Sequence, residues 1–498
     1  LTSDFNKGIN NIEYWRTAEL PKIITFDKGT ISYTHDDLGN KLKKVTVENP
    51  STANGNHTIT TTTTYLGSCV FESKTTSPAD ANSPDYTNRL QFIAQEEGRI
   101  RPQYTNASTP NTPTGFVYDY FIKDHLGNTR MVLTVEYKQD IYPAATLEGD
   151  INTDGSPNAA YIDKDYYTIN STNIVLKDSA TGITDYPNHN GNPPVNNNPN
   201  SNTTANSGKL YKLNSNTNKT GLGITLKVMA GDRIDIFGKS YYFQNNTGGT
   251  GANSAIPVLD ILTGLLGGPT GGTAAAAHGG VTASQLNGIG NVTGGITTLL
   301  GDQTTDAAGT PTVPKAYINY IFFDEQFKVA QSGFSRAGSN SVVKTHTDLT
   351  NKTAPKNGYV YIYVSNESPV DVFFDNLQVI HTRGAILEET HYYPFGLTMA
   401  GISSKALAFG NPKNKRGYNG NEIQDKEFSD GSGLEFYDFN ARTYDQQIGR
   451  FLQIDSLSEQ GGQESLSPYH FGKNNPVRYN DPDGKCPMCL IPFLPAIG

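Results

Sequence analysis

The stretch Gly433–Gly484 constrains the fold more than any other part of the chain. Its aromatic residues recur too closely to share one face of an amphipathic helix: Phe436, Tyr437, Phe439, Tyr444 and Phe451. Turn-forming residues interrupt them, because proline presets φ and glycine accepts a positive φ. The turns are Gly449-Arg450, Asn474-Asn475-Pro476 and Asp481-Pro482-Asp483-Gly484. The stretch therefore predicts short strands joined by tight turns.

The composition agrees with an all-β fold. Charged residues make up only 17% of the 498 residues, and Gly, Asn, Thr, Ser and Tyr are abundant instead. A chain of this length is expected to form two or three units. Its three cysteines, Cys69, Cys486 and Cys489, are too few for a disulfide framework. Burial and backbone hydrogen bonding must therefore hold the fold together.

The charge balance and hydropathy restrict the partners. Lys and Arg total 39 against 48 Asp and Glu, a net charge of −9, and this disfavours nucleic acid as a partner. No apolar run approaches the length of a membrane span. We expect an exported protein, extracellular or on the cell surface. No signal-peptide pattern follows Leu1, so we expect a piece of a longer or processed product.

Two consecutive motifs carry a resemblance to a known family. Asn440–Asp455 reads NARTYDQQIGRFLQID, and Ser467–Gly484 reads SPYHFGKNNPVRYNDPDG. Together they resemble the core domain that closes the shell of Rhs/YD-repeat proteins, in the form common in Bacteroidota. The resemblance implies a bacterial protein and the C-terminal part of a hollow β-shell. The structural motif residues that it identifies here are Gly449, Arg450, Pro476 and Gly484.

Earlier segments match the same family in order. Ile31–Leu42 resembles a YD repeat, and Asp124–Arg130, DHLGNTR, resembles the hairpin that precedes the core domain. In the family, a Y-x-PFG segment soon follows that hairpin, whereas here it comes much later. The motif residues are Asp124, His125, Gly127, Arg130, Tyr393, Pro394 and Gly396. The gap predicts a domain inserted between two strands that remain neighbours.

The predicted insert has the sequence pattern of a β-sandwich. Its strand-like segments are Ile224–Met229, Arg233–Phe237, Ala316–Phe323, Gly358–Val364 and Val372–His381. The last segment contains VFFDNLQVIH, which is similar to the closing strand of jelly-roll domains that resemble carbohydrate-binding modules. Pro187–Ser207 is expected to be a surface loop, and Thr247–Pro314 is expected to contain one short helix, Ile256–Leu266.

These boundaries predict four parts. Residues 1–138 hold the YD-repeat strands and the DHLG hairpin, and residues 139–385 hold the insert with its long Gly/Asn/Thr-rich loops. Residues 386–485 form the core domain, and residues 486–498 form an apolar tail.

The sharpest chemical hypothesis concerns Asp455 and Asp481. The resemblance implies that such a pair cleaves its own chain, here between Lys485 and Cys486. Two carboxyl groups held close together cannot both ionise, so one keeps a proton while the other activates water. The sequence departs from cleaving relatives at Ser456 and Lys485. The alternative is that both aspartates cap turns through their side chains.

Two further patterns suggest metal or redox chemistry. Asp150, Asn152 and Asp154 have the spacing of the first ligands of a calcium loop, and Gly155 follows them. Tyr161 occupies the place of the expected bidentate acid, so an ordinary turn is the alternative. Cys486-Pro-Met-Cys489 has C-x-x-C spacing without a second pair. Apart from possible calcium, we expect no cofactor.

Three functions remain open. The first is an Rhs-type shell that encloses or presents its C-terminal segment or a passenger, in toxin delivery or as a scaffold or adhesin served by secretion or cell-surface machinery. The second is binding of surface glycans by the insert, through exposed aromatics such as Tyr241, Tyr242 and Phe243. The third is an aspartyl protease that acts once, after Lys485. We do not expect a multiple-turnover enzyme.

Overall fold

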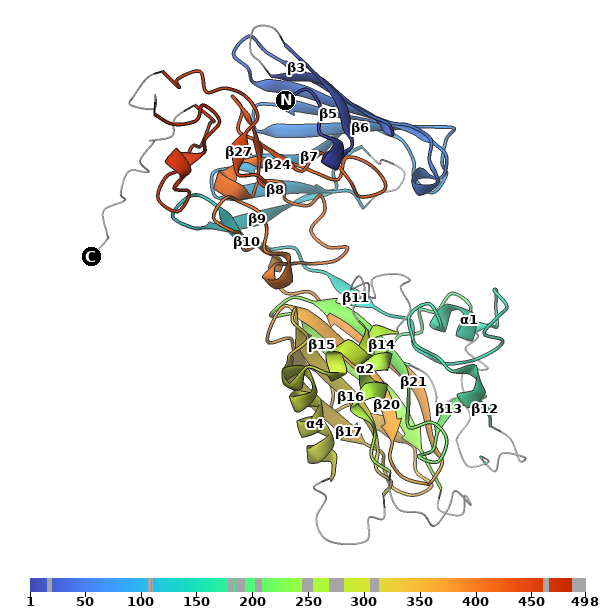
Figure 1. The fold of residues 1–498 in the computed structure, drawn as a ribbon. Coiled ribbons are helices and arrows are strands. Elements are labelled where there is room, and N and C mark those ends of the chain that lie inside the picture. The colour runs from blue at the N-terminus through green and yellow to red at the C-terminus, as the bar shows by residue number, and fades with distance from the viewer. Residues whose placement is uncertain are drawn as a thin grey trace. The chain divides into compact units, whose positions relative to one another are not determined.

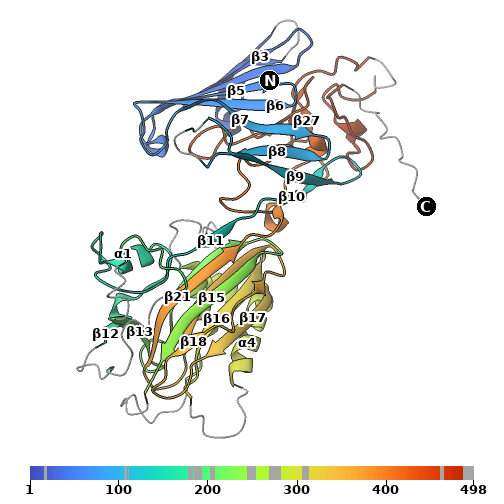
Figure 2. The ribbon, with the colours of Figure 1, turned by 180° about the vertical axis from the view of Figure 1, so that it is seen from behind.

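The computed structural model describes residues 1–15, 20–105, 109, 111–177, 183, 193–201, 208–243, 254–267, 282–304, 313–459 and 465–485. The chain forms two compact units. The first comprises Leu1–Glu136, Leu387–Ser403 and Gly410–Gly498, and the second comprises Tyr137–Ile386 and Ser404–Phe409. β-Strands in several sheets dominate both units, which confirms the predicted all-β class (Figures 1 and 2).

The first unit is built on a twelve-stranded sheet, of which every strand except the two-residue β23 (Ser404–Lys405) lies wholly or largely in this unit. Its strands are β1 (Ile9–Tyr14), β2 (Pro21–Phe26), β3 (Gly29–His35), β4 (Lys41–Glu48), β5 (Thr58–Leu66), β6 (Cys69–Ser77), β7 (Tyr86–Gln95), β8 (Gly98–Gln103), β9 (Gly115–Lys123), β10 (Thr129–Thr134), β22 (Ile386–Glu389) and β23 (Ser404–Lys405). From β1 to β10 each strand pairs antiparallel with the next one along the chain. Such a meander needs only local turns, which the closely spaced turn residues supply.

The two predicted hairpin motifs form separate turns that have the same hydrogen-bond pattern. In the segment Ile31–Leu42, Asp36 Oδ1 accepts hydrogen bonds from the backbone N–H groups of Leu38 and Asn40, at 3.0 and 2.8 Å. In the DHLG segment, Asp124 Oδ1 accepts the corresponding bonds at 3.0 and 3.1 Å. The glycine of each turn has a positive φ, 84° and 80°, which residues with a Cβ rarely adopt. The aspartate and the glycine thus define the turn.

The C-terminal segment covers one face of the sheet. Ile24 and Tyr33 on the sheet belong to one buried cluster with Phe428, Leu434 and Phe436 of that segment. The opposite face of β9 is uncovered among the described residues: its outward side chains are about half exposed, whereas Val117, Asp119 and Phe121 are buried. The outward residues are Phe116, Tyr118, Tyr120 and Ile122. The alternation follows from the two-residue period of a strand.

The C-terminal segment itself folds as the sequence predicts, into very short strands. These are β24 (Glu422–Gln424), β25 (Phe436–Asp438), β26 (Thr443–Asp445) and β27 (Arg450–Phe451), paired antiparallel in that order. The recurring aromatics form one buried cluster: Tyr418, Tyr437, Phe439, Tyr444, Phe451 and Phe471. Strands this short contribute few ladder hydrogen bonds, so aromatic packing must hold the segment together.

The second unit is a sandwich of two sheets. One sheet contains β11 (Gln139–Ile141), β12 (Ile174–Leu176), β13 (Lys209–Leu213), β15 (Arg233–Tyr241), β18 (Lys344–His346), β19 (Lys352–Thr353) and β21 (Val372–Thr382). The other contains β14 (Thr220–Val228), β16 (Ala316–Asp324), β17 (Val329–Arg336) and β20 (Gly358–Asn366). Apolar side chains from both sheets, such as Ile236 and Ile362, form one fully buried core. All five predicted strand segments lie in these sheets.

Helices cover the outer face of the second sheet, and two of them were not predicted (Figure 1). The helices of this unit are α1 (Ala159–Asp163), α2 (Val258–Leu266), α3 (Ala283–Asn287) and α4 (Gly290–Thr304). Helix α2 confirms the predicted Ile256–Leu266 segment. Helices α3 and α4 correct the expectation that the rest of Thr247–Pro314 is loop. Val292, Ile296 and Leu299 of α4 recur at helical spacing and are buried against the sheet.

The predicted surface loop Pro187–Ser207 lies partly outside the described residues. Its described part, 193–201, packs against the sandwich. Asn198 Nδ2 donates to Asp163 Oδ1 at 2.8 Å, and Val195 N donates to Gln378 Oε1 at 3.0 Å.

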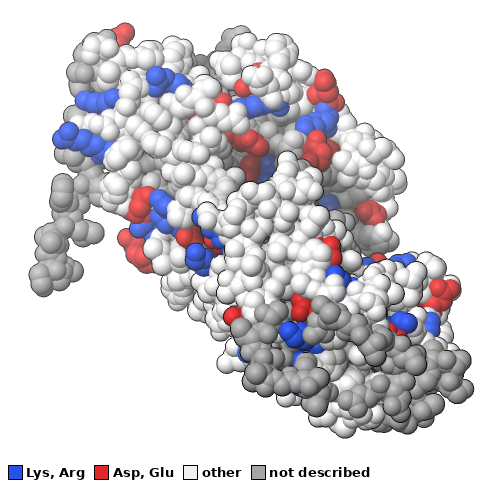
Figure 3. Space-filling model, turned by 60° about the horizontal axis from the view of Figure 1, so that its bottom comes forward, with Lys and Arg blue, Asp and Glu red and all other residues white. Residues whose placement is uncertain are grey.

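On the face shown in Figure 3, basic and acidic side chains are interspersed among many uncharged residues, as the low charged fraction implies.

Candidate functional site

The predicted carboxylate pair meets at an arginine that the sequence analysis did not single out. Arg442 follows the tight turn between β25 and β26, where Phe439 N donates to Arg442 O at 3.0 Å. Its Nη2 lies 3.1 Å from Asp455 Oδ2 and 2.8 Å from Asp481 Oδ2. Both carboxylates are fully buried, and the arginine side chain is 2% exposed. The structure therefore brings Asp455 and Asp481 together on one cation.

Arg442 also fixes the backbone around the pair. Its Nε donates to Gly484 O at 2.6 Å, and its Nη1 donates to Pro468 O at 3.4 Å. The guanidinium carbon lies 3.7 Å from the centre of the Phe451 ring. The guanidinium, which remains charged in proteins, thus holds the chain immediately before Lys485 next to the carboxylate pair, because it donates to backbone carbonyl oxygens and to the carboxylates at the same time.

Electrostatics at this site are finely balanced. Burial lowers the pKa of the Arg442 guanidinium from its ordinary value, and the charges of Asp455 and Asp481 oppose that shift. Two carboxylates facing one guanidinium would leave one negative charge in excess if both were ionised. Such a charge is costly in a buried site unless hydrogen-bond donors offset it.

The alternative role as a turn cap is visible at Asp455. Asp455 Oδ1 accepts from Leu457 N at 2.9 Å, an Asx turn. Close to Asp481, Asp483 Oδ1 accepts from Lys485 N at 3.1 Å. Asp455 thus caps a turn and faces Arg442 at the same time. Lys485 is exposed, and Cys486, its partner in the predicted scissile bond, lies outside the described residues.

The DHLG hairpin and the Y-x-PFG segment meet despite their separation in sequence. Arg130 Nε donates to Thr390 O at 2.9 Å, and Thr390 N donates to Arg130 O at 2.8 Å. Arg130 Nη2 lies 2.8 Å from His391 Nδ1, and Asp124 Oδ2 lies 3.6 Å from Arg130 Nη1. His125 Nε2 lies 3.4 Å from Val477 O, next to Pro476. His125 and Arg130 therefore connect the hairpin to residues 386–485, and Asp124 pairs with Arg130 within the hairpin.

The remaining motif residues shape turns around the aromatic cluster. Gly396 closes a turn with Tyr393, its N–H donating to Tyr393 O at 2.8 Å. A Cβ at Gly396 would come within 2.6 Å of the Tyr418 ring, whose hydroxyl donates to Pro394 O at 2.8 Å. Gly127, Gly449 and Gly484 all have positive φ, and the side chain of Arg450 bonds to Asn474.

The proposed calcium ligands serve as turn caps in the structure. Asp150 Oδ1 accepts from Asn152 N at 2.9 Å, and Asp150 Oδ2 accepts from Thr153 Oγ1 at 2.9 Å. Asp154 Oδ1 accepts from Gly155 N at 2.7 Å. Within the described part of the chain, no group of three or more His, Cys, Asp or Glu side chains could hold a metal ion. A calcium site at Asp150, Asn152 and Asp154 stays a prediction that would need these oxygens to change partners.

The aromatic residues proposed for sugar stacking are not exposed. Tyr241 and Tyr242 are 1% and 2% exposed, and the Phe243 ring lies stacked on Phe373 with centroids 6.2 Å apart. The expectation of an exposed aromatic platform there is wrong, because Tyr242 lies in the core between the sheets and Tyr241 lies in a second buried cluster, against which Phe243 packs.

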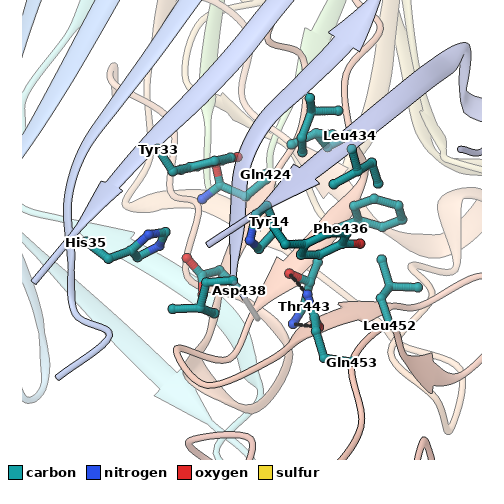
Figure 4. A pocket seen from close by; sticks show the side chains of 14 residues that line it. Tyr14, Tyr33, His35, Gln424, Leu434, Phe436, Asp438, Thr443, Leu452 and Gln453 are labelled. Carbon is teal, nitrogen blue, oxygen red and sulfur yellow. Dashed lines mark hydrogen bonds between the residues drawn. The ribbon is translucent and has the colours of Figure 1, made fainter. Parts of the chain in front are cut away.

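A small cavity lies between the first strands of the sheet and the C-terminal segment (Figure 4). Its volume is about 30 Å³, and Figure 4 shows Tyr33, His35, Gln424, Asp438 and Phe436 around it. Burial lowers the pKa of His35, while Asp438 acts in the opposite direction. This volume accommodates a water-sized group and no organic substrate.

Among the residues that the structure describes, no helix is both long and apolar enough to cross a membrane.

Comparison with known proteins gives partial likenesses. No family model matches the chain. Salivary gland surface protein 1 of Aedes aegypti is 32% identical over 113 residues, which are 23% of this chain and 3% of that protein. The crystal structure of TcdB2-TccC3-Cdc42 matches 96% of this chain and 10% of its own chain, with a TM-score of 0.36 and 12% identity. That of TcdB2-TccC3-TEV matches with a TM-score of 0.16, 13% identity and 19% coverage of its own chain. This chain thus spans a small part of each protein that it matches.

Proposed function

We propose that this chain is the C-terminal part of a secreted or cell-surface Rhs-type shell protein, which encloses or presents its own C-terminal segment. The observation that supports this role is that residues 411–485 cover one face of the β1–β10 meander. Lys44 Nζ on the sheet lies 2.6 Å from Glu427 Oε1, and Lys41 Nζ lies 2.8 and 2.7 Å from Glu422 and Asp438 carboxylate oxygens.

These ion pairs tie the sheet to the core segment. Lys44 and Glu427 are 7% and 2% exposed, so each would be an unpaired buried charge without the other. A sheet that carries buried charges on its inner face depends on the core segment to neutralise them. The sheet and residues 411–485 therefore pack together as one structure. In this proposal, that structure encloses the chain that follows Lys485.

Thiol accessibility tests the enclosure. A Cys69→Ser variant keeps only the two tail cysteines, Cys486 and Cys489. We expect a maleimide to label them at least tenfold more slowly in the native protein than in urea. The reference is Val342→Cys, 55% exposed, in a variant whose three natural cysteines are serine. Native labelling of the tail as fast as that of position 342 would contradict enclosure.

A second candidate function is single-turnover self-cleavage after Lys485, favoured by the convergence of Asp455 and Asp481 on Arg442. In this candidate function, one carboxyl would act as the acid and the other would activate the attacking water. Denaturing mass spectrometry of wild type, Asp455→Asn and Asp481→Asn tests this. If the pair cleaves the chain, the wild type is cut and each substitution alone blocks the cut. A wild type that stays intact would leave the aspartates with a structural role.

The cargo and the setting of the shell are further parts of the proposal. A passenger or toxin would occupy the enclosure in a delivery protein, whereas a scaffold or adhesin would present its sandwich unit to surface glycans. A glycan array with the full chain separates these roles, since binding is expected only of the adhesin.

A further inference from the structure

A second, larger hollow lies within the first unit, where the sheet meets residues 411–485. Its volume is about 200 Å³. The sheet contributes an apolar wall, formed by Tyr65, Val70 and Phe92. Tyr65 pairs with Val70, and Val70 pairs with Phe92, so these three side chains share one face of the sheet. Charged and amide side chains, among them Arg416 and Asn440, make up most of the remaining lining.

The charged side chains of the lining pair with one another. Lys41 Nζ lies 2.8 Å from Glu422 Oε2 and 2.7 Å from Asp438 Oδ2. Burial would raise the pKa of Glu422, but the charges of Lys41 and other nearby lysines lower it to about 2, so the carboxylate stays ionised. Arg99, also in the lining, pairs with Asp119 at 2.8 Å. A ligand with a net charge would compete with these pairs, so the lining favours a neutral ligand.

Several polar groups around the hollow can bind a further partner. Among the described residues, the side chains of Ser68, Arg416 and Asn440 form no hydrogen bond or ion pair, and all three residues are exposed. The side chains of Glu422 and Asp438 are 25% and 24% exposed, and each carboxylate oxygen can accept more than one hydrogen bond. Donors and acceptors therefore face the same space.

The volume and the apolar wall suit a six-membered ring. A cavity of roughly 150 Å³ is known to accept benzene, so a hollow of about 200 Å³ has room for a ring with substituents. Phe92 is only partly buried. The face of an aromatic ring is electrically negative, so the C–H groups on one side of a sugar ring can pack against it. Hydroxyl groups both donate and accept, which matches the mixed polar lining.

We infer that this hollow is a binding site for a neutral sugar ring. The ring would pack on the wall that contains Phe92. Its hydroxyl groups would donate to the carboxylates of Glu422 and Asp438 and accept from Arg416. The site belongs to the first unit, so it is separate from the sandwich unit and goes beyond the proposed shell role.

Ligand-observed NMR with the full chain tests the site. The probes are the methyl glycosides of glucose, galactose and mannose, each at millimolar concentration. We expect at least one to bind, and Arg416→Ala to weaken that binding at least tenfold, because hydrogen bonds from charged donors are among the stronger ones. The matched control is Arg478→Ala, an exposed arginine outside the hollow, which should bind as wild type does. No binding of any probe, or equal binding by Arg416→Ala and wild type, would overturn the inference.

A charged probe tests the preference for a neutral ligand. Methyl glucuronoside has the ring of methyl glucoside with a carboxylate added. We expect it to bind more weakly than the best neutral probe, since its charge meets Glu422 and Asp438. Equal or tighter binding of the acid would contradict a neutral-sugar site.

Filling the hollow provides an independent measurement. Ala94 lines it beside Phe92, two positions away on the same strand, so Ala94→Leu should take up part of the space for the ring. We expect at least tenfold weaker binding of the same probe, with thermal unfolding as the check that the variant is folded. Undiminished binding would place the sugar elsewhere.

This inference and the proposed enclosure can fail separately. Maleimide labelling of the tail does not depend on sugar binding, and sugar binding at the hollow does not depend on the tail. Glycan binding that Arg416→Ala and Ala94→Leu both retain would belong to another surface of the chain and would overturn the assignment made here.

Discussion

Arg442 is the residue on which the C-terminal segment depends most at the level of single side chains. It pairs with both Asp455 and Asp481 and donates to the carbonyl oxygens of Gly484 and Pro468. No other residue type offers five donors in one rigid plane, so lysine cannot reproduce these contacts.

We predict that Arg442→Met lowers the free energy of unfolding of the first unit by about 3–5 kcal/mol, because it strands two buried carboxylates. Arg442→Lys should cost less, since it keeps the charge. The measurement is urea unfolding, in which hydrogen exchange in peptides of the first unit reports the fraction unfolded. Arg478→Met, on an exposed arginine, is the control and should change stability by less than about 0.5 kcal/mol. A loss below about 1 kcal/mol in Arg442→Met would show that the aspartates do not need the cation.

Glu148 makes stability depend on pH at the residue scale. Its Oε1 accepts from Gly208 N and Lys209 N at 2.8 and 2.9 Å, yet burial raises its pKa from 4.5 to about 7. The folded state then binds the proton more tightly than the unfolded state. This contribution to stability is complete below pH 4.5 and is lost as the pH rises through 7.

We predict that Glu148→Gln flattens this pH dependence in the second unit. The amide keeps an acceptor for both N–H groups and cannot ionise, so the variant should become more stable than wild type as the pH rises from 5 to 8, by up to about 3 kcal/mol. Hydrogen exchange in β13–β15 at each pH reports it. Glu435→Gln, on an exposed turn of the first unit, should leave the wild-type slope unchanged. Parallel slopes for wild type and Glu148→Gln would contradict the assignment.

Helix α4 shows at the element scale how two adjacent glycines differ. A Cβ at Gly294 would meet no atom within 4 Å, whereas a Cβ at Gly295 would lie 2.4 Å from Val329 Cβ. The first glycine is therefore exposed helix surface, and the second is a point of close contact between the helix and the sheet.

We predict opposite effects for the two alanine substitutions. Gly294→Ala should stabilise the second unit by about 0.5–1 kcal/mol, because alanine favours the helix. Gly295→Ala should destabilise it by about 1–3 kcal/mol through overpacking against β17. Urea unfolding of both variants in parallel, read by hydrogen exchange in α4 and β16, is a self-controlled comparison. The same sign for both would mean that α4 does not pack on the sheet as described.

Elements with strong local signals were predictable, and those that depend on tertiary contacts were not. The turns at Asp36 and Asp124 follow from their own residues, because one carboxylate and one glycine determine each turn. Helix α4 was missed because glycine and threonine dominate it, and its apolar stripe gains meaning only against the sheet. The role of Arg442 was missed because its partners are 13 and 39 positions away, although an arginine inside an aromatic run signals a buried ion pair.

At the scale of the whole molecule, the sandwich unit enters and leaves the first unit between neighbouring strands. β10 and β22 are adjacent in the twelve-stranded sheet, and Arg130 and Thr390 exchange hydrogen bonds although they lie 260 residues apart. The host fold therefore keeps its two attachment points together by contacts of its own. An exposed connection of this kind tolerates both insertion and removal of a domain.

We predict that replacing Tyr142–Thr382 by a short Gly/Ser linker leaves a folded, soluble first unit. The strand pairing across the junction does not require the removed residues, and a short linker costs little closure entropy. Circular dichroism and hydrogen exchange in β1–β10 measure the outcome, with the full chain as reference. A matched deletion of residues 411–485 is the control, and it should unfold the sheet because Lys41 and Lys44 would lose their buried partners. If the first deletion aggregates as the second does, the first unit needs the sandwich to fold and the inserted-domain interpretation is wrong.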